Sequence, residues 1–317
     1  MQSLRGRPAT NRNTPLIHKT TKSRPVPPEA EAVSKLKQQI YFRTKTTMQD
    51  LRQSKEFAHY MEKINWRVGK EKNFQFYVRC LPVLGNFIKI PRPPKSINSR
   101  TINALAKKHH AFAVKVDYSP TKTLILDLKP KLEEILAQTK KDCRYEIKKA
   151  QKNQVVIKKL EDIETFIKIW HRNALRRGFW IPFGKEIRNI YEAFGKNSYL
   201  LLAHQSPITN HQSPISGALI LIHDKVAYYF HAASTLEGRK LSAPYLVVWE
   251  AIKLAKKKGC EIFDFEGIYD ERFPIKSWKG FTHFKKSFGG YEVKYPAPLI
   301  EFYSPILTFI ARLRREV

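Results

Sequence analysis

Two segments decide how the chain folds, Val226-Ala-Tyr-Tyr-Phe-His-Ala232 and Glu261-Ile-Phe-Asp-Phe265. Both are rich in aromatic and branched apolar residues, which favours β-strands. The segment between them, Ala243–Lys258, carries apolar residues at helical spacing and predicts a long helix. The sequence therefore predicts a strand, a helix and a second strand in this order.

The flanking sequence extends this pattern in both directions. Strands are predicted at Tyr199–Ala203 and Ala218–His223, which together with 226–232 form a meander. A short helix near 278–287 leads to a further strand at Tyr291–Tyr295. A meander followed by a helix and a strand is the order of an acetyltransferase-like α/β unit.

The first half of the chain follows the same order less clearly, with predicted helices at Gln49–Asn65 and 99–110 among four strands. We therefore expect an α/β fold with two tandem acetyltransferase-like (GNAT-like) domains. The expected division is a disordered basic arm at 1–35, an N-terminal domain at 36–150, a C-terminal domain at 151–298 and an amphipathic helix at 299–317.

The charge balance points to a polyanionic partner. Lys and Arg number 58 and Asp and Glu 28, for a net charge of +30. Such a surface attracts nucleic acid, anionic lipid or phosphorylated substrates. The alternative is an organism whose proteins are all basic. The first 35 residues are basic and poor in apolar residues, which is typical of a disordered arm, either inert or in contact with a polyanion.

Several functional classes are disfavoured by motifs that the sequence lacks. The three cysteines show no C-x-x-C spacing, which argues against a disulfide framework and a structural zinc site. We therefore expect no metal. We expect a cytoplasmic protein, because no signal peptide or long apolar run is present. H-E-x-x-H, Walker and dinucleotide-binding motifs are also absent. Catalysis by positioning and charge stabilisation remains.

Three motifs in a fixed order carry a family resemblance: Arg144-Tyr-Glu-Ile-Lys-Lys-Ala-Gln-Lys-Asn153, Phe263-Asp-Phe-Glu-Gly-Ile268 and Gly280-Phe-Thr-His-Phe-Lys-Lys-Ser-Phe-Gly-Gly290. Together they resemble the Fem-type (FemA/FemB/FemX) aminoacyltransferases, which build the interpeptide bridge of peptidoglycan. Further landmarks lie upstream at Leu51-Arg-Gln-Ser54, Trp66, Pro82-Val-Leu-Gly85 and Pro91-Arg-Pro93.

The resemblance implies two GNAT-like domains that transfer an amino acid from aminoacyl-tRNA to an amine of a peptidoglycan precursor, with no cofactor beyond the tRNA donor. The FemA and FemB branch also carries a long helical hairpin arm. The predicted helices at 161–196 are too short and too apolar for such an arm, so the chain is more similar to the armless branch.

The resemblance assigns the catalytic position to Lys285, with Phe284 packing against the donor. The chemistry agrees, because attack of an amine on an ester generates an oxyanion and an alkoxide that a fixed lysine stabilises. Asp264 lies at the end of a predicted strand and would hold the amine or the peptide, with Glu266 as a similar candidate; the alternative for Asp264 is a turn cap. Gly267 completes this candidate substrate-binding segment through its backbone geometry.

Four basic residues are candidates for phosphate contacts. Arg144 and Lys148 share one helix face, and Arg239 and Lys240 precede the long helix, whose start can hold an anion. The alternative for Arg144 and Lys148 is a solvated basic face. A second glycine of a coenzyme A phosphate cradle is missing beside Arg239, which favours a tRNA donor. Tyr228 is a further candidate contact, and strand alternation predicts that it and His231 point to opposite faces.

The segment Leu299–Leu313 has an amphipathic stripe that either packs on the domain or lies on the inner membrane surface. We expect a monomer.

Two other functions stay open: an acyl-CoA-dependent N-acyltransferase of a cell-surface sugar or small amine, and a non-catalytic basic RNA-binding module. The sequence leaves the transferred amino acid undetermined, and also whether the precursor is lipid-linked or nucleotide-linked.

Overall fold

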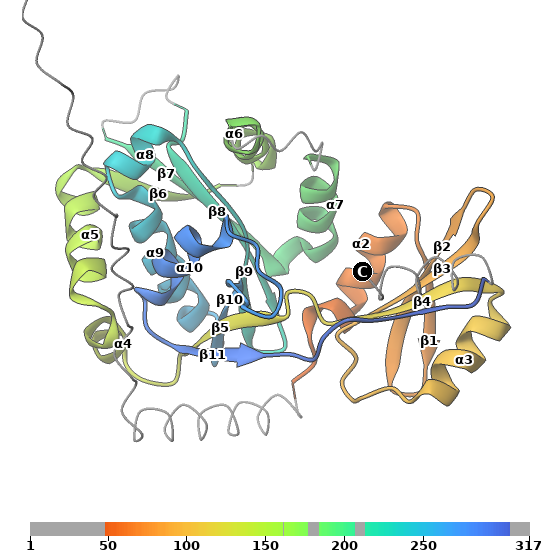
Figure 1. The fold of residues 1–317 in the computed structure, drawn as a ribbon. Helices are drawn as coiled ribbons and strands as arrows, with labels where there is room; N and C mark the ends of the chain where they lie inside the picture. The colour runs from red at the N-terminus through yellow and green to blue at the C-terminus, as the bar shows by residue number, and fades with distance from the viewer. Residues whose placement is uncertain (1–47, 161, 177–183, 207–212, 305–317) are drawn as a thin grey trace, which may run out of the picture.

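The computed structural model describes residues 48–160, 162–176, 184–206 and 213–304 as an α/β protein with two sheets (Figure 1). The first sheet has the strand order β1-β2-β3-β4-β12. Its strands are β1 Arg67–Glu71, β2 Phe74–Leu81, β3 Gly85–Pro91, β4 Ala111–Asp117 and β12 Leu299–Phe302.

The second sheet has seven strands in the order β11-β5-β10-β9-β8-β7-β6. They are β5 Lys122–Asp127, β6 Val155–Leu160, β7 Ser198–Gln205, β8 Ser216–His223, β9 Val226–Ser234, β10 Ile262–Gly267 and β11 Tyr291–Lys294. Strands β7 to β9 form the predicted antiparallel meander, and β6 pairs antiparallel with β7 beside it. β10 then lies parallel to β9 and antiparallel to β5.

Helices cover both faces of the second sheet. One face packs on α4 Leu132–Gln138, α5 Lys141–Lys152 and α9 Ala243–Lys257, and the other on α2 Lys55–Lys63, α6 Ile163–Arg176 and α7 Gly184–Phe194. The remaining helices are α3 Ser99–Lys108 on the first sheet, α8 Leu236–Lys240, α10 Trp278–Lys286 and two 3-10 turns, η1 Leu51–Gln53 and η2 Gly195–Asn197.

The local sequence explains where the helices begin. Ser54 accepts a hydrogen bond from the Phe57 amide at the start of α2, and Asn98 accepts one from the Thr101 amide at the start of α3. Both are side-chain caps that satisfy amides otherwise left without partners. Pro244 stands in the first turn of α9, where a missing amide donor costs nothing.

The domain division differs from the expected one at residue 150. β5, α4 and α5 precede that residue, yet they belong to the second sheet and its core. β5 is almost wholly buried because it pairs with β10 on one side and β11 on the other. The chain therefore leaves the first sheet between β4 and β5.

The C-terminal helix predicted from residue 299 is wrong at its start. Residues Leu299–Phe302 form β12, which pairs antiparallel with β4 and returns the chain to the first sheet. The pairing satisfies backbone groups along the edge of β4, which outweighs the weak helical spacing of the apolar residues. Residues 305–317 and the expected arm at 1–35 lie outside the described residues.

A long coiled-coil arm is absent from the part of the chain that the structure describes, whose longest helix is α9 with 15 residues. Among the same residues, every helix is too short or too polar to cross a membrane.

Candidate active site

A pocket opens where β9 and β10 diverge. The two strands pair in parallel only from Val226 to Tyr228 and from Ile262 to Asp264. Beyond that point β9 forms one wall, and α10 with the start of α9 forms the other. The cavity has a volume of about 620 Å³. Its lining includes Asn173, Ser216, Tyr229, Phe230, Ala232, Ala233, Ser234, Arg239, Pro244, Tyr245, Ser277, Gly280, Phe281, Phe284 and Lys285.

A bulge in β9 decides which side chains reach this pocket. Tyr229 pairs with Ile220 but His231 pairs with Leu219, so Phe230 is an extra residue on β9. Tyr228 and His231 consequently point to the same face, and the predicted alternation is wrong. Tyr228 lies fully buried in the core beneath α2, α6 and α7, and Tyr229 takes the place on the pocket wall.

Lys285 presents its ammonium group to the pocket from α10. Its Nζ donates a hydrogen bond to the Gly267 carbonyl at 2.7 Å. Nζ also lies 5.0 Å from the ring centre of Phe281 and 6.0 Å from that of Tyr229. Burial lowers the pKa of Lys285 to about 8, against a raising effect of the carboxylates of Glu266 and Asp264. A cation with so low a pKa is poorly solvated and available to a reacting group.

Phe284 lines the pocket beside Lys285 and is partly buried. Its ring makes edge-to-face contacts with the rings of Tyr245 and Phe288, at distances between ring centres of 4.9 Å and 5.5 Å. Such edge-to-face pairs hold a ring in a defined orientation. The predicted pair Phe284 and Lys285 therefore lies side by side on one wall of the cavity.

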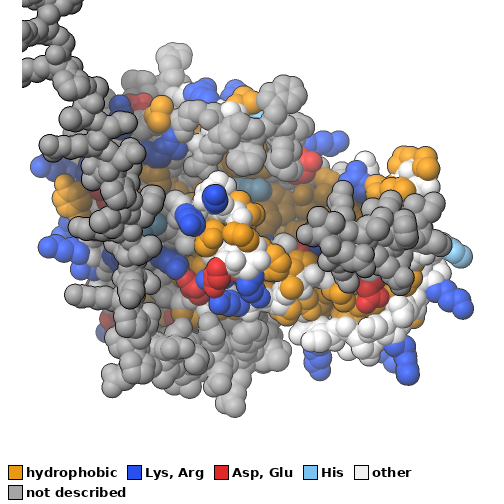
Figure 2. Space-filling model, in the orientation of Figure 1, with side chains coloured by type: hydrophobic (Ala, Val, Ile, Leu, Met, Phe, Trp, Pro, Cys, Tyr) orange, Lys and Arg blue, Asp and Glu red, His pale blue; other side chains and the backbone are white. Residues whose placement is uncertain are grey.

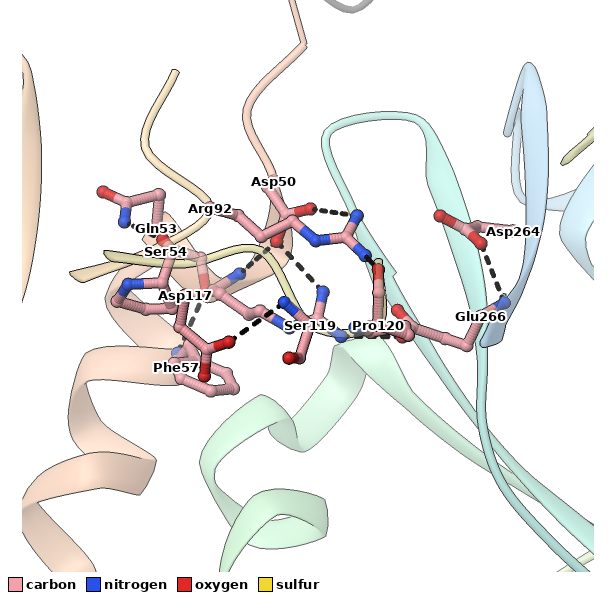
Figure 3. A network of polar contacts seen from close by, with 12 residues as sticks. Asp50, Gln53, Ser54, Phe57, Arg92, Asp117, Ser119, Pro120, Asp264 and Glu266 are labelled. Atoms are coloured by element: carbon pink, nitrogen blue, oxygen red, sulfur yellow. Dashed lines mark hydrogen bonds and ion pairs between the residues drawn. The ribbon is translucent and has the colours of Figure 1, made fainter. Parts of the chain in front are cut away.

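The three residues predicted at the end of β10 lie behind Lys285. The Glu266 amide donates to Asp264 Oδ1 at 2.8 Å, the turn-capping contact considered from the sequence (Figure 3). The Glu266 carboxylate pairs with Arg52 at 2.7 Å. Gly267 has no room for a side chain, since a Cβ there would meet the Trp278 ring at 2.7 Å.

The basic candidates separate into two groups. Arg239 lines the pocket, where its Nη1 donates to the Ser234 carbonyl at 3.3 Å, and Lys240 follows it in α8, exposed to solvent. Arg144 instead donates to the carbonyls of Ala137 and Thr139 and so fixes the corner between α4 and α5. Lys148 is exposed on α5, away from the pocket lining.

Sequence reasoning missed four residues of this site: Tyr229, Phe281, Tyr245 and Arg52. The first was hidden by the bulge in β9. Phe281 was within a quoted motif, but its side-chain direction depends on where α10 begins. Arg52 was within the landmark Leu51-Arg-Gln-Ser54, and its partner lies 214 residues away. Among the described residues, no group of three or more His, Cys, Asp or Glu side chains is placed to hold a metal ion.

The family model described as "FemAB family" matches residues 86–207 and 205–306, which together span most of the chain. The chain belongs to the FemAB family. The second matched stretch contains β9, β10 and α10, and hence the whole pocket wall that carries Lys285. The FemAB-family chain is thus an acyltransferase of the peptidoglycan-bridge type.

Solved structures support the fold of this FemAB-family chain. A crystal structure of FemX superposes with a TM-score of 0.70 at 17% identity, covering 86% of this chain and 98% of that chain. L-PGS from Bacillus licheniformis superposes with a TM-score of 0.51 at 9% identity, covering 92% of this chain and 96% of that chain. No protein of curated function matches the chain in sequence.

Proposed function

We propose that the chain transfers an amino acid from aminoacyl-tRNA to an amine of a peptidoglycan precursor. The observation that carries the proposal is the Lys285 ammonium, held at 2.7 Å from the Gly267 carbonyl and flanked by aromatic rings on the pocket wall. Family membership and the resemblance of the motif around Lys285 support the same assignment.

The proposed reaction exchanges an ester bond for an amide bond. The acceptor amine attacks the carbonyl carbon of the aminoacyl ester, a new N–C bond forms, and the C–O bond to the ribose breaks. The proton lost by the amine ends on the released ribose hydroxyl. Lys285 stabilises the negative charge that develops first on the carbonyl oxygen and then on the leaving oxygen. Phe284 and Phe281 exclude water and strengthen that interaction.

An exposed stripe on α5 supports a polyanionic donor. Lys141, Tyr145, Lys148 and Lys152 lie three or four residues apart on the solvent side of the helix, and Tyr145 is 63% exposed. These three lysines make no ion pair with any described carboxylate. Figure 2 shows Lys and Arg side chains over α5 at the left edge of the molecule. Lysines interleaved with an exposed ring suit a phosphate backbone.

The stripe is connected to the pocket through the start of α9. Glu146 on α5 accepts a hydrogen bond from Ser242, which immediately precedes α9. Tyr245, in the first turn of α9, lines the pocket. We propose that the acceptor stem of the tRNA lies along α5 while its aminoacyl end enters the pocket.

The experiment is incubation with a mixed aminoacyl-tRNA pool, a nucleotide-linked precursor and a lipid-linked precursor, with acetyl-coenzyme A as the parallel donor. Mass spectrometry should find one precursor heavier by a single amino-acid residue. Acetylation of a precursor by acetyl-coenzyme A, without aminoacylation, would instead support the acyl-CoA-dependent alternative. Binding of tRNA without modification of either precursor would support the RNA-binding alternative.

A further inference from the structure

Glu266 adopts a backbone conformation that its side chain disfavours. Its φ is +59°, in the left-handed region that residues with a Cβ rarely enter outside sites where the surroundings impose it. The Asp264 carboxylate accepts the Glu266 amide at 2.8 Å and stabilises the turn locally. A glycine would adopt this turn without strain, so the glutamate side chain requires a separate explanation.

The side chain of Glu266 is tied to the N-terminal segment. Its Oε2 lies 2.7 Å from Arg52 Nη2, and both side chains are only 10% exposed. Arg52 Nη1 lies 3.2 Å from Asp50 Oδ1, so the guanidinium bridges two carboxylates (Figure 3 shows Glu266 extending from β10 towards the segment of Asp50). Removing one partner of a buried ion pair is strongly destabilising, because the other charge is left buried without compensation. The contact therefore fixes the end of β10 against η1.

The residue after Glu266 holds Lys285. Gly267 presents its carbonyl to Lys285 Nζ at 2.7 Å, and the space around Gly267 is closed by Trp278 and Pro120. The direction of this carbonyl follows from the turn at Glu266. A change of that turn would move the acceptor that orients the ammonium group.

We propose that Arg52 is a positioning residue of the transfer site: through its ion pair with Glu266 it maintains the turn in which the Gly267 carbonyl orients Lys285. This inference rests on the proposed function of Lys285. It assigns a role to the landmark Leu51-Arg-Gln-Ser54, which otherwise has no part in the pocket.

The charged groups around Lys285 allow a test that needs no substrate. Glu266 and Asp264 face it from β10, Arg239 lines the same cavity from α8, and the Tyr229 ring faces it from β9. The Cε carbon signal of Lys285, assigned with Lys285→Arg, can be titrated by NMR in ¹³C-lysine-labelled protein. Arg52→Gln removes the guanidinium that is paired with the Glu266 carboxylate, so that this carboxylate acts more strongly on Lys285 and should raise the pKa of Lys285. Glu266→Gln should lower it.

The second readout is transfer. Both variants should lower kcat about tenfold or more with KM little changed, because a misplaced catalytic group costs rate rather than binding. Arg52→Lys should restore part of the rate. The matched control is Arg188→Gln, which breaks the exposed pair of Arg188 with Glu164 between α7 and α6, at 2.8 Å. It should change neither the pKa of Lys285 nor kcat.

If the pKa of Lys285 is unchanged in both Arg52→Gln and Glu266→Gln, the inference is overturned. The ion pair is then a structural contact only, whether or not the variants lose thermal stability. If Arg52→Gln does not fold, Glu266→Gly replaces it, because glycine can adopt the left-handed turn but cannot form the ion pair with Arg52. A wild-type protein without transfer activity would contradict the proposed function, while the NMR titration would still decide the role of Arg52.

Discussion

The two sides of α10 carry the same residue type in opposite settings. Lys285 faces the split between β9 and β10, donates to the Gly267 carbonyl, and has a pKa lowered by burial to about 8. Lys286, the next residue, turns to β11 and pairs with Glu292. Neighbouring lysines in one motif are thus distinguished by the direction of the helix face and by what each side chain meets there.

The different partners of the two lysines identify the reactive side of α10. A lysine paired with a carboxylate at the surface is already neutralised and solvated, so it offers little to a developing oxyanion. A lysine whose acceptor is a neutral carbonyl keeps its positive charge available. The pocket side of α10 is therefore the reactive side, and the β11 side maintains the fold.

Removing each lysine in turn should give the largest difference between the two sides of α10. Lys285→Ala should lower the single-turnover transfer rate by about 1,000-fold, since it removes the charge that stabilises the oxyanion. Lys286→Ala should stay within about twofold of wild type. Far-ultraviolet circular dichroism serves as the folding control. Equal losses in both variants would contradict the account.

Two phenylalanines of the same segment, Phe288 and Phe284, should differ in their contributions to stability. Phe288 is fully buried in the core beside Phe265, so Phe288→Ala should lower the free energy of unfolding by about 3 kcal/mol or more. Phe284→Ala should cost less stability and raise KM for the donor, because its ring lines the pocket. Urea titration and transfer kinetics measure the two effects. A Phe284→Ala protein with unchanged KM would exclude donor contact at this wall.

The sequence was sufficient for the elements that depend on local pattern. The helix predicted at Ala243–Lys258 is α9, the strand at Glu261–Phe265 is β10, and the α/β class with a meander is confirmed. Lys285 and Phe284 could be located because a motif places them on a short helix after that strand.

The remaining features depend on partners far away in the chain. β5 joins the second sheet because β10 and β11 pair with it, which no local pattern shows. The bulge at Phe230 changes the face of every later residue of β9, and only the register with β8 reveals it. The ion pair of Arg52 with Glu266 joins residues 214 positions apart, so neither residue signals the other.

The pH dependence of transfer should separate the two lysines again. Because the pKa of Lys285 is lowered to about 8, its ammonium form is present below that pH and is lost above it. The rate should rise as the acceptor amine loses its proton, and it should fall about tenfold per unit once the pH exceeds both the pKa of that amine and the pKa of Lys285. Lys286→Ala should keep this falling limb. The limb should disappear from the residual rate of Lys285→Ala, and its persistence there would assign it to another group.

The smallest effect is expected from the surface pair. Lys286 and Glu292 are 42% and 28% exposed, so Lys286→Ala should lower the free energy of unfolding by less than about 1 kcal/mol. Raising the salt concentration should reduce the difference from wild type further, as screening weakens exposed pairs. A loss above about 2 kcal/mol in urea titration would show that the β11 side of α10 is more tightly coupled than its exposure suggests.

The most direct test of the central claim follows one acceptor through one reaction. Purified protein is mixed with aminoacyl-tRNA and the peptidoglycan precursor that the mixed-pool experiment identifies, and the precursor is weighed by mass spectrometry. The acceptor amine should gain one amino-acid residue, and this gain should be abolished when the tRNA is first digested with ribonuclease and lost in Lys285→Ala. A gain that survives ribonuclease, or that Lys285→Ala produces at the wild-type rate, would contradict the central claim.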